Sequence, residues 1–244
     1  MGTRLVQVNM KALDDSALGR FWAEALGWEM SSEGPGVTNL EPVGFVYPDP
    51  VAVVVDLVLS SEPKTVKNRV HLDLATATVE EQEEMVRRLE GLGASRVDVG
   101  QGEVPWVVMG DPEGNEFCVL EPREIYRDTG PVAAVVVDCL DPRGMAGFWG
   151  RATDWVVHEV GDELARLRSG AGVGPYLEFV RTAEVKTVWN RVHLDVRPYP
   201  GDDVEVEAER LQELGASAVD LGQEVSWRVL ADPEGNEFCL LAPG

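Results

Sequence analysis

The feature that most constrains the fold of this chain is an internal repeat. Residues 64–120 recur as residues 186–241, at an offset of half the chain length. A repeat of this length is typical of a duplicated domain, and each half is long enough to bury its own core. We therefore expect two domains, at residues 1–124 and 125–244.

The two copies agree most closely in two short stretches. Lys64–Asp73 recurs as Lys186–Asp195 with one change, and Asp111–Cys118 recurs letter for letter as Asp232–Cys239. The chain has three histidines and three cysteines, and two of each lie at matching places, namely His71 and His193, and Cys118 and Cys239. The first strands and helices of the halves differ much more. The similarity is therefore local, and it marks a candidate site.

The composition excludes several classes of partner. The chain has 43 acidic and 21 basic residues, a net charge of -22, which repels phosphate backbones and would suit a cationic small-molecule ligand. We expect no nucleic-acid partner. No apolar run reaches about 18 residues and no signal-peptide pattern is present, which predicts no membrane partner and a cytoplasmic location. Three cysteines cannot all pair in disulfides, which fits a reducing compartment.

Local patterns predict a strand, a helix and three more strands at the start of the chain. Residues Leu5–Met10 alternate as a half-buried strand does. Asp14 or Asp15 then caps a helix that Gly27 ends, with one apolar stripe formed by Leu18, Phe21, Trp22, Ala25 and Leu26. The next strands are predicted at Val37–Leu40, Phe45–Tyr47 and Val51–Leu59.

The same order of elements then begins three more times. The second unit starts at Arg69, and Thr78 with Glu81 forms a capping box at its helix. The third has a strand at Val132–Val137, and the fourth starts at Arg191. The chain is therefore predicted to be α+β, with four βαβββ units, numbered 1 to 4 in chain order, in two pairs.

Two motifs carry a resemblance to a known family. Phe21–Trp28 follows the first strand, and the turn Asp111–Asn115 precedes the last strand of the second unit. This arrangement resembles the vicinal oxygen chelate (VOC) superfamily, in its glyoxalase-like and bleomycin-resistance-like branch. The resemblance implies two tandem glyoxalase-like domains in which pairs of units curl into cups of antiparallel strands. Some members bind one divalent metal ion in the cup, and others are metal-free drug binders.

The resemblance also implies four metal-ligand positions for each cup. In the first half these are Gln7, Asp56, His71 and Cys118, and in the second half Ala134, Glu178, His193 and Cys239. If units pair across the halves, the sets become Gln7, Asp56, His193 and Cys239, or Ala134, Glu178, His71 and Cys118. The sequence leaves this pairing open. Alanine cannot bind a metal, and cysteine replaces a hard oxygen by sulfur, which favours zinc or iron over magnesium; nickel and manganese are further candidates.

Strand alternation places Arg69, His71 and Asp73 on one face of their strand. An imidazole beside a carboxylate can act as an acid or base near neutral pH, and an arginine can stabilise an oxyanion. The same three residues would equally form a structural ladder of ion pairs. His71 and His193 are thus the candidate catalytic residues. The candidate ligand-binding residues are Gln7, Arg69, Asp73, Trp106, Glu178, Arg191, Asp195 and Trp227.

These observations predict a protein that binds a small organic molecule in one or both cups, with undetermined chemistry. One alternative is a divalent-metal-dependent lyase or isomerase of glyoxalase type, and another is a metal-free protein that sequesters a drug. Metal-free catalysis by the histidines is a third. The fused halves predict either a monomer that imitates a dimer or a homodimer.

Overall fold

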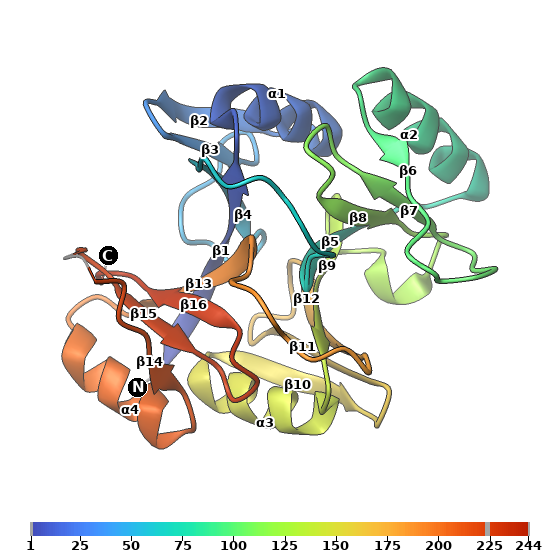
Figure 1. The fold of residues 1–244 in the computed structure, drawn as a ribbon. Coiled ribbons are helices and arrows are strands. Elements are labelled where there is room, and N and C mark those ends of the chain that lie inside the picture. The colour runs from blue at the N-terminus through green and yellow to red at the C-terminus, as the bar shows by residue number, and fades with distance from the viewer. Residues whose placement is uncertain (1, 223–224, 244) are drawn as a thin grey trace.

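The computed structural model describes residues 2–222 and 225–243. Within these residues the chain forms four α-helices and two eight-stranded sheets (Figure 1). The predicted α+β class and the four βαβββ units are confirmed. No helix among the described residues is long and apolar enough to cross a membrane.

Unit 1 consists of β1 (Thr3–Ala12), α1 (Asp15–Leu26), β2 (Glu29–Gly34), β3 (Val37–Glu41) and β4 (Val54–Leu59). Asp14 caps α1 by accepting a hydrogen bond from the backbone N–H of Ala17 at 2.9 Å. The prediction of a strand at Phe45–Tyr47 is wrong, because this segment forms turns between prolines, and β2 takes its place in the unit. β2 shows no apolar alternation because it is a mostly exposed edge strand.

The other three units repeat this order of elements. Unit 2 comprises β5 (Val70–Leu74), α2 (Val79–Gly91), β6 (Ser95–Arg96), β7 (Val107–Gly110) and β8 (Glu116–Val119). A single 3₁₀ turn, η1 (Glu124–Tyr126), leads to unit 3, which comprises β9 (Val132–Cys139), α3 (Pro142–Ala152), β10 (Trp155–Val160), β11 (Leu164–Ser169) and β12 (Tyr176–Arg181). Unit 4 comprises β13 (Val192–Pro198), α4 (Val204–Glu213), β14 (Ser217–Ala218), β15 (Arg228–Ala231) and β16 (Glu237–Leu240).

The sheets pair units across the two halves of the chain. Sheet A has the strand order β14-β15-β16-β13-β1-β4-β3-β2, and sheet B has the order β10-β11-β12-β9-β5-β8-β7-β6. β1 lies antiparallel to β13 at the centre of sheet A, and β5 lies antiparallel to β9 at the centre of sheet B. Unit 1 therefore shares a sheet with unit 4, and unit 2 with unit 3. This pairing resolves the alternative that the sequence left open.

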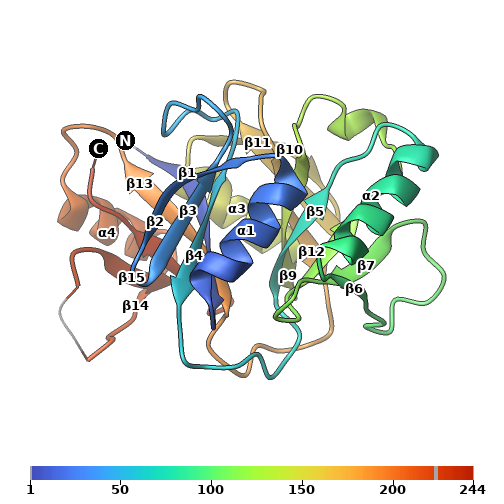
Figure 2. The same ribbon diagram turned by 90° about the horizontal axis from the view of Figure 1, so that it is seen from above.

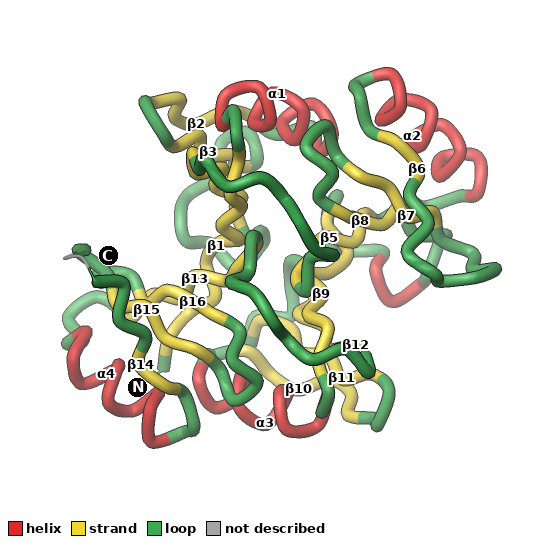
Figure 3. The backbone as a smooth tube through the Cα atoms, in the orientation of Figure 1, coloured by secondary structure: helices red, strands yellow, loops and turns green. Residues whose placement is uncertain are grey.

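Aromatic packing in the core joins unit 1 to unit 2 and unit 3 to unit 4, which differs from the pairing of units in the sheets. Trp22 of α1 packs against Phe117 of β8 with ring centroids 5.0 Å apart, and Trp149 of α3 packs against Phe238 of β16 at 5.1 Å. Helices α1 and α2 lie together at one side of the molecule, and α3 and α4 at the opposite side, with the strands between them (Figure 2, Figure 3). Each unit is thus joined to one neighbour by a sheet and to another by side-chain packing.

Candidate functional site

The cup of sheet A, here called the A cup, brings together residues from units 1 and 4. Gln7 lies opposite Asp195 in the pairing of β1 with β13, and Asp195 lies beside Cys239 of β16. The amide Nε2 of Gln7 donates hydrogen bonds to Asp56 at 2.7 Å and to Asp195 at 2.9 Å. Because Asp56 is buried, its pKa is raised to about 6.

His193 completes a compact cluster on the unit 4 side of the A cup. Its Nε2 lies 3.3 Å from Oδ1 of Asp195 and 3.4 Å from Sγ of Cys239. Oδ1 of Asp195 is buried and has no hydrogen-bond partner among the described residues. Burial raises the pKa of the Cys239 thiol.

The cup of sheet B, here called the B cup, repeats this cluster with residues of unit 2. Nε2 of His71 lies 3.5 Å from Oδ1 of Asp73, and Asp73 lies beside Cys118 in the pairing of β5 with β8. Burial lowers the pKa of His71 to about 4, so the imidazole is uncharged at neutral pH. Burial, with the nearby Glu178 carboxylate as the second cause, raises the pKa of Asp73 to about 7.

Unit 3 contributes a carboxylate that faces this cluster. Glu178 accepts a hydrogen bond from the hydroxyl of Tyr126 at 2.8 Å and lies 3.5 Å from Nε of Arg166. Burial raises the pKa of Glu178 despite the arginine. Sequence reasoning missed Tyr126, which lies in the segment between the halves, where no strand or helix pattern indicates its direction. It also missed Arg166, which lies opposite Glu178 on the neighbouring strand.

The B cup contains a cavity of about 550 Å³. Side chains from both units line it, among them His71, Asp73, Trp106, Cys118, Arg166 and Glu178. The A cup has a smaller cavity of about 340 Å³, lined by Gln7, Tyr47, Asp56 and Arg197 among others. The structure thus places the candidate residues of the B cup around one cavity, in combinations that only the cross-half pairing produces.

The two candidate tryptophans lie in different surroundings although they match in the repeat. Trp106 lines the cavity of the B cup, where the guanidinium of Arg123 lies 5.6 Å from its ring centroid. Trp227 lies in a separate groove beside α4, together with Ala208 and Gln212. The equivalent sequence positions therefore do not give equivalent sites.

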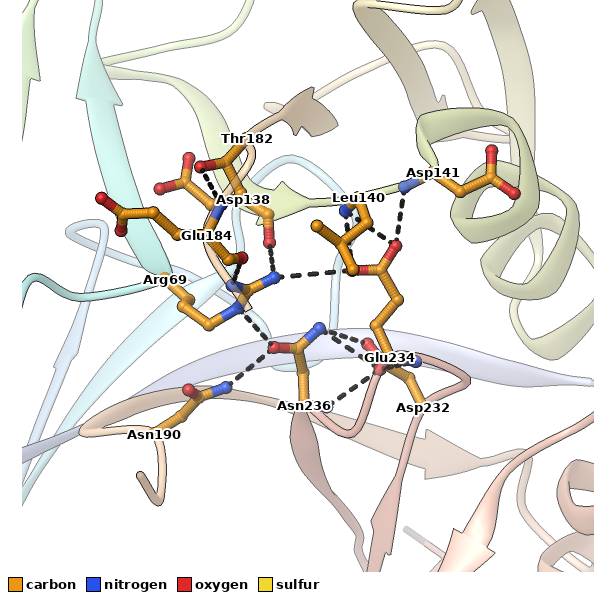
Figure 4. Close-up of polar contacts among 10 residues, drawn as sticks. All are labelled: Arg69, Asp138, Leu140, Asp141, Thr182, Glu184, Asn190, Asp232, Glu234 and Asn236. Atoms are coloured by element: carbon orange, nitrogen blue, oxygen red, sulfur yellow. Dashed lines mark hydrogen bonds and ion pairs between the residues drawn. The ribbon is translucent and has the colours of Figure 1, made fainter. Parts of the chain in front are cut away.

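Arg69 and Arg191 point away from the cups, toward the junction between the two sheets. Arg69 donates to the backbone oxygens of Asp138 at 2.7 Å and of Glu184 at 2.8 Å, and to Oδ1 of Asn236 at 3.2 Å (Figure 4). Glu234 lies within 3.5 Å of the same guanidinium. Because these contacts hold the Arg69 side chain between the two sheets, it does not line the cavity that His71 lines.

The contacts of Arg191 mirror those of Arg69. It donates to Oδ1 of Asn115 at 3.0 Å and to the backbone oxygen of Glu62 at 2.6 Å, and it pairs with Glu113. Glu113 also accepts hydrogen bonds from the backbone at Leu13, just before α1. The turn before the last strand of unit 2 therefore contacts an arginine of unit 4 and the start of the helix of unit 1. The matching turn of unit 4 contacts an arginine of unit 2 and the start of the helix of unit 3.

The residues present fit a divalent metal ion in each cup. The imidazole, carboxylate and thiol atoms of the cluster His71, Asp73 and Cys118, and of the cluster His193, Asp195 and Cys239, all lie within 4.8 Å of one another. Oδ1 of Asp73, like that of Asp195, is buried without a hydrogen-bond partner in the part of the chain that the structure describes. A buried carboxylate oxygen of this kind is stabilised by a cation.

Comparison with known proteins agrees with this architecture. Residues 7–120 and 134–241 each match the family model described as glyoxalase-like domain. Glyoxalase I from Zea mays has a similar structure, with a TM-score of 0.67 and 16% identity over 99% of this chain and 92% of that chain. A putative dioxygenase from Bacillus subtilis subsp. subtilis str. 168 has a TM-score of 0.61 and 11% identity over 99% of this chain and 86% of that chain.

At such identities the structural likeness shows the fold alone. A comparison with curated proteins gave no match. The two matches to the family model together span most of the sequence. The chain therefore belongs to the glyoxalase-like domain family of the VOC superfamily, with two tandem domains.

Proposed function

We propose that this chain binds a small organic molecule in the B cup. The observation that carries this proposal is the cavity of about 550 Å³, around which polar and aromatic side chains of units 2 and 3 converge. Ligand pockets in proteins commonly have volumes of roughly 300 to 1,000 Å³ and a few convergent polar groups. The A cup, with its smaller cavity and with Gln7 bonded to both carboxylates, is the weaker candidate.

The lining of the B cup supports binding of a ligand that has an apolar body and a polar end. Trp106 offers an aromatic wall, while His71 and Asp73 offer polar groups on one strand. Glu178 faces them from unit 3 and is held by Tyr126, so its orientation is fixed. Burial also raises the pKa of Glu178, and it raises the pKa of Asp73 on the opposite wall to about 7, so Asp73 is suited to accept or release a proton near neutral pH.

A ligand titration with paired tryptophan variants tests this proposal. We suggest small aromatic compounds with neighbouring oxygens as probes, namely catechol, 4-methylcatechol and dopamine, with binding detected by ligand-observed NMR. Binding is expected in the wild type and in Trp227→Phe, and is expected to weaken in Trp106→Phe. The Trp227 variant is the matched control because that residue lines neither of the two cavities and lies in the separate groove beside α4. Binding that weakens equally in both variants, or no binding by any probe, would count against a site in the B cup.

The second candidate is metal-dependent chemistry of glyoxalase type. The two clusters of histidine, aspartate and cysteine support it. A bound divalent ion would polarise an oxygen of the ligand. In the B cup His71, Asp73 and Cys118 would hold the ion, and Glu178 would hold or move a proton from the opposite wall.

Elemental analysis of untagged protein tests this second candidate. Stoichiometric zinc, iron, nickel or manganese is expected, with a reduced content in His71→Ala and His193→Ala. Protein that carries no metal, and whose thermal melting is unchanged by added divalent ions, would remove the metal-dependent candidate. The proposal of small-molecule binding would then stand alone.

A further inference from the structure

We propose that each cup binds its metal ion through three residues of one unit, so that the chain holds two ions. The B cup would use His71, Asp73 and Cys118 of unit 2, and the A cup would use the matching residues of unit 4. This inference rests on the metal-dependent candidate. It departs from the pattern implied by the resemblance. In that pattern both units of a cup supply ligands, and Asp73 and Asp195 are not among them.

The distances within the clusters match those of a metal-binding site. Tetrahedral ligands at about 2.1 Å for nitrogen and oxygen and about 2.3 Å for sulfur lie roughly 3.3 to 3.6 Å from one another. Nε2 of His193 lies 3.3 Å from Oδ1 of Asp195 and 3.4 Å from Sγ of Cys239. In the B cup, Nε2 of His71 lies 3.5 Å from Oδ1 of Asp73. These three distances are those expected between ligands of one ion, and the remaining pairs of ligand atoms in each cluster lie within 4.8 Å.

The aspartate is the residue that points most directly to an ion. Asp195 is 2% exposed and Asp73 is 8% exposed, and in both the Oδ1 atom that faces the histidine has no hydrogen-bond partner among the described residues. An unpaired carboxylate oxygen in such a place is costly. Its occurrence twice, in matching geometry, indicates a shared role in ligation and not an isolated defect of packing.

The positions in units 1 and 3 are committed to other contacts. In the A cup, the amide nitrogen of Gln7 donates to Asp56 and to Oδ2 of Asp195, and its Oε1, the atom that could bind a metal, accepts from the hydroxyl of Tyr47 at 3.4 Å. In the B cup, Ala134 has no ligand atom, and Glu178 accepts from Tyr126. Ligation by one unit leaves all of these contacts in place. Gln7 contacts Oδ2 of Asp195 and leaves Oδ1 free to face the cluster.

The donor set indicates the class of ion. One imidazole nitrogen, one carboxylate oxygen and one thiolate favour a borderline ion such as zinc or iron over magnesium or calcium. Three protein ligands leave a fourth position free, as in catalytic zinc sites. In the B cup, that position would open toward the cavity lined by all three residues.

Cobalt binding provides a direct test, because thiolate ligation to Co²⁺ gives an intense near-ultraviolet absorption. Chelator-treated full-length protein is titrated with Co²⁺, and two ions per chain are expected. Cys118→Ser and Cys239→Ser should each remove half of this absorption. Asp73→Asn and Asp195→Asn should each weaken one site at least about tenfold. The unchanged site in the other cup serves as an internal control for folding.

The companion variants separate this inference from the broader metal proposal. Gln7→Ala and Glu178→Gln should still bind two ions. Loss of one ion in either variant, with retention in the aspartate variants, would overturn ligation by one unit while supporting a metal site built from both units. Absence of any cobalt signal in the wild type would overturn both. A stoichiometry of one ion per chain would overturn the matching roles of the two cups.

Discussion

Nε of Arg69, two residues before His71 in the B cup, donates a hydrogen bond of 3.2 Å to Asn236, in the turn that leads to the cysteine strand of the A cup. Arg191 makes the same contact with Asn115 in the opposite direction. These two arginines therefore tie the sheets together at points next to both candidate sites. This structural role accounts in part for the agreement between the two copies of the repeat around the histidines.

Removal of Arg191 should strongly destabilise the fold. Its side chain is 8% exposed, and Arg191→Ala would leave the part-buried carboxylate of Glu113 without its cation. We expect a loss of about 3 to 5 kcal/mol in the free energy of unfolding, measured by urea denaturation. Arg127→Ala removes an exposed ion pair with Glu124 and should change the stability by no more than about 0.5 kcal/mol. Equal effects of the two substitutions would contradict the role of Arg191.

The two core tryptophans should respond differently to the same substitution. Nε1 of Trp22 donates to Asp111 at 3.1 Å, whereas Nε1 of Trp149 has no partner among the described residues. Trp22→Phe and Trp149→Phe remove similar apolar area, but only the first takes a donor from a buried carboxylate. Trp22→Phe should therefore cost about 1 to 3 kcal/mol more in thermal or urea unfolding. A larger loss for Trp149→Phe would show that packing dominates at both sites.

Asp56 should make stability fall as the pH rises. Its pKa is raised from 3.8 to about 6 because it is buried, so the folded state keeps the proton longer than the unfolded chain does. The resulting stabilisation is fully present below about pH 4 and is lost as the pH rises through about 6. For two pKa units the difference is roughly 3 kcal/mol. Asp56→Asn should remove this contribution, seen as a changed slope of stability between pH 4 and 6; parallel curves would contradict it.

Two glycines in one loop provide a matched test of the contact between units 1 and 3. Gly172 and Gly174 both have left-handed backbones, with φ of 71° and 74°. A Cβ at Gly172 meets open space, whereas one at Gly174 would lie 2.1 Å from the carbonyl oxygen of Pro50. Gly172→Ala should cost about 1 to 2 kcal/mol from backbone strain alone. Gly174→Ala should cost about 1 to 3 kcal/mol more in urea unfolding, and similar losses would exclude a close approach there.

The sequence predicted the repeated units well because their signals are local. The apolar stripe that includes Trp22, the capping box at Thr78 and the glycine that ends α1 all act within a few residues, and each lies where it was expected. Strand alternation also placed His71 and Asp73 on one face. The repeat singled out Cys118 together with His71, and the family resemblance then placed this cysteine at a metal-ligand position.

What the sequence left open depends on contacts between distant segments. Pairing of units within each half and pairing across the halves use the same set of strands, so no local sequence pattern distinguished the two arrangements. The alternation of β5 was expected to bring Arg69 to the site of His71, but its long side chain reaches across to Asn236 instead. Tyr126 was missed because its contact with Glu178 is made from a connecting segment.

The cross-half pairing of the sheets also sets an order of assembly during synthesis. Sheet B is built from one continuous stretch of chain, from β5 to β12, with only α2, the short strands β6 to β8 and the η1 turn between its central strands β5 and β9. Sheet A must join Gln7 to Asp195, which are separated by 188 residues. During synthesis, all strands of the B cup are therefore available before β13, the partner of β1, has been made. The A cup forms last, and β1 exposes an unpaired strand edge until then.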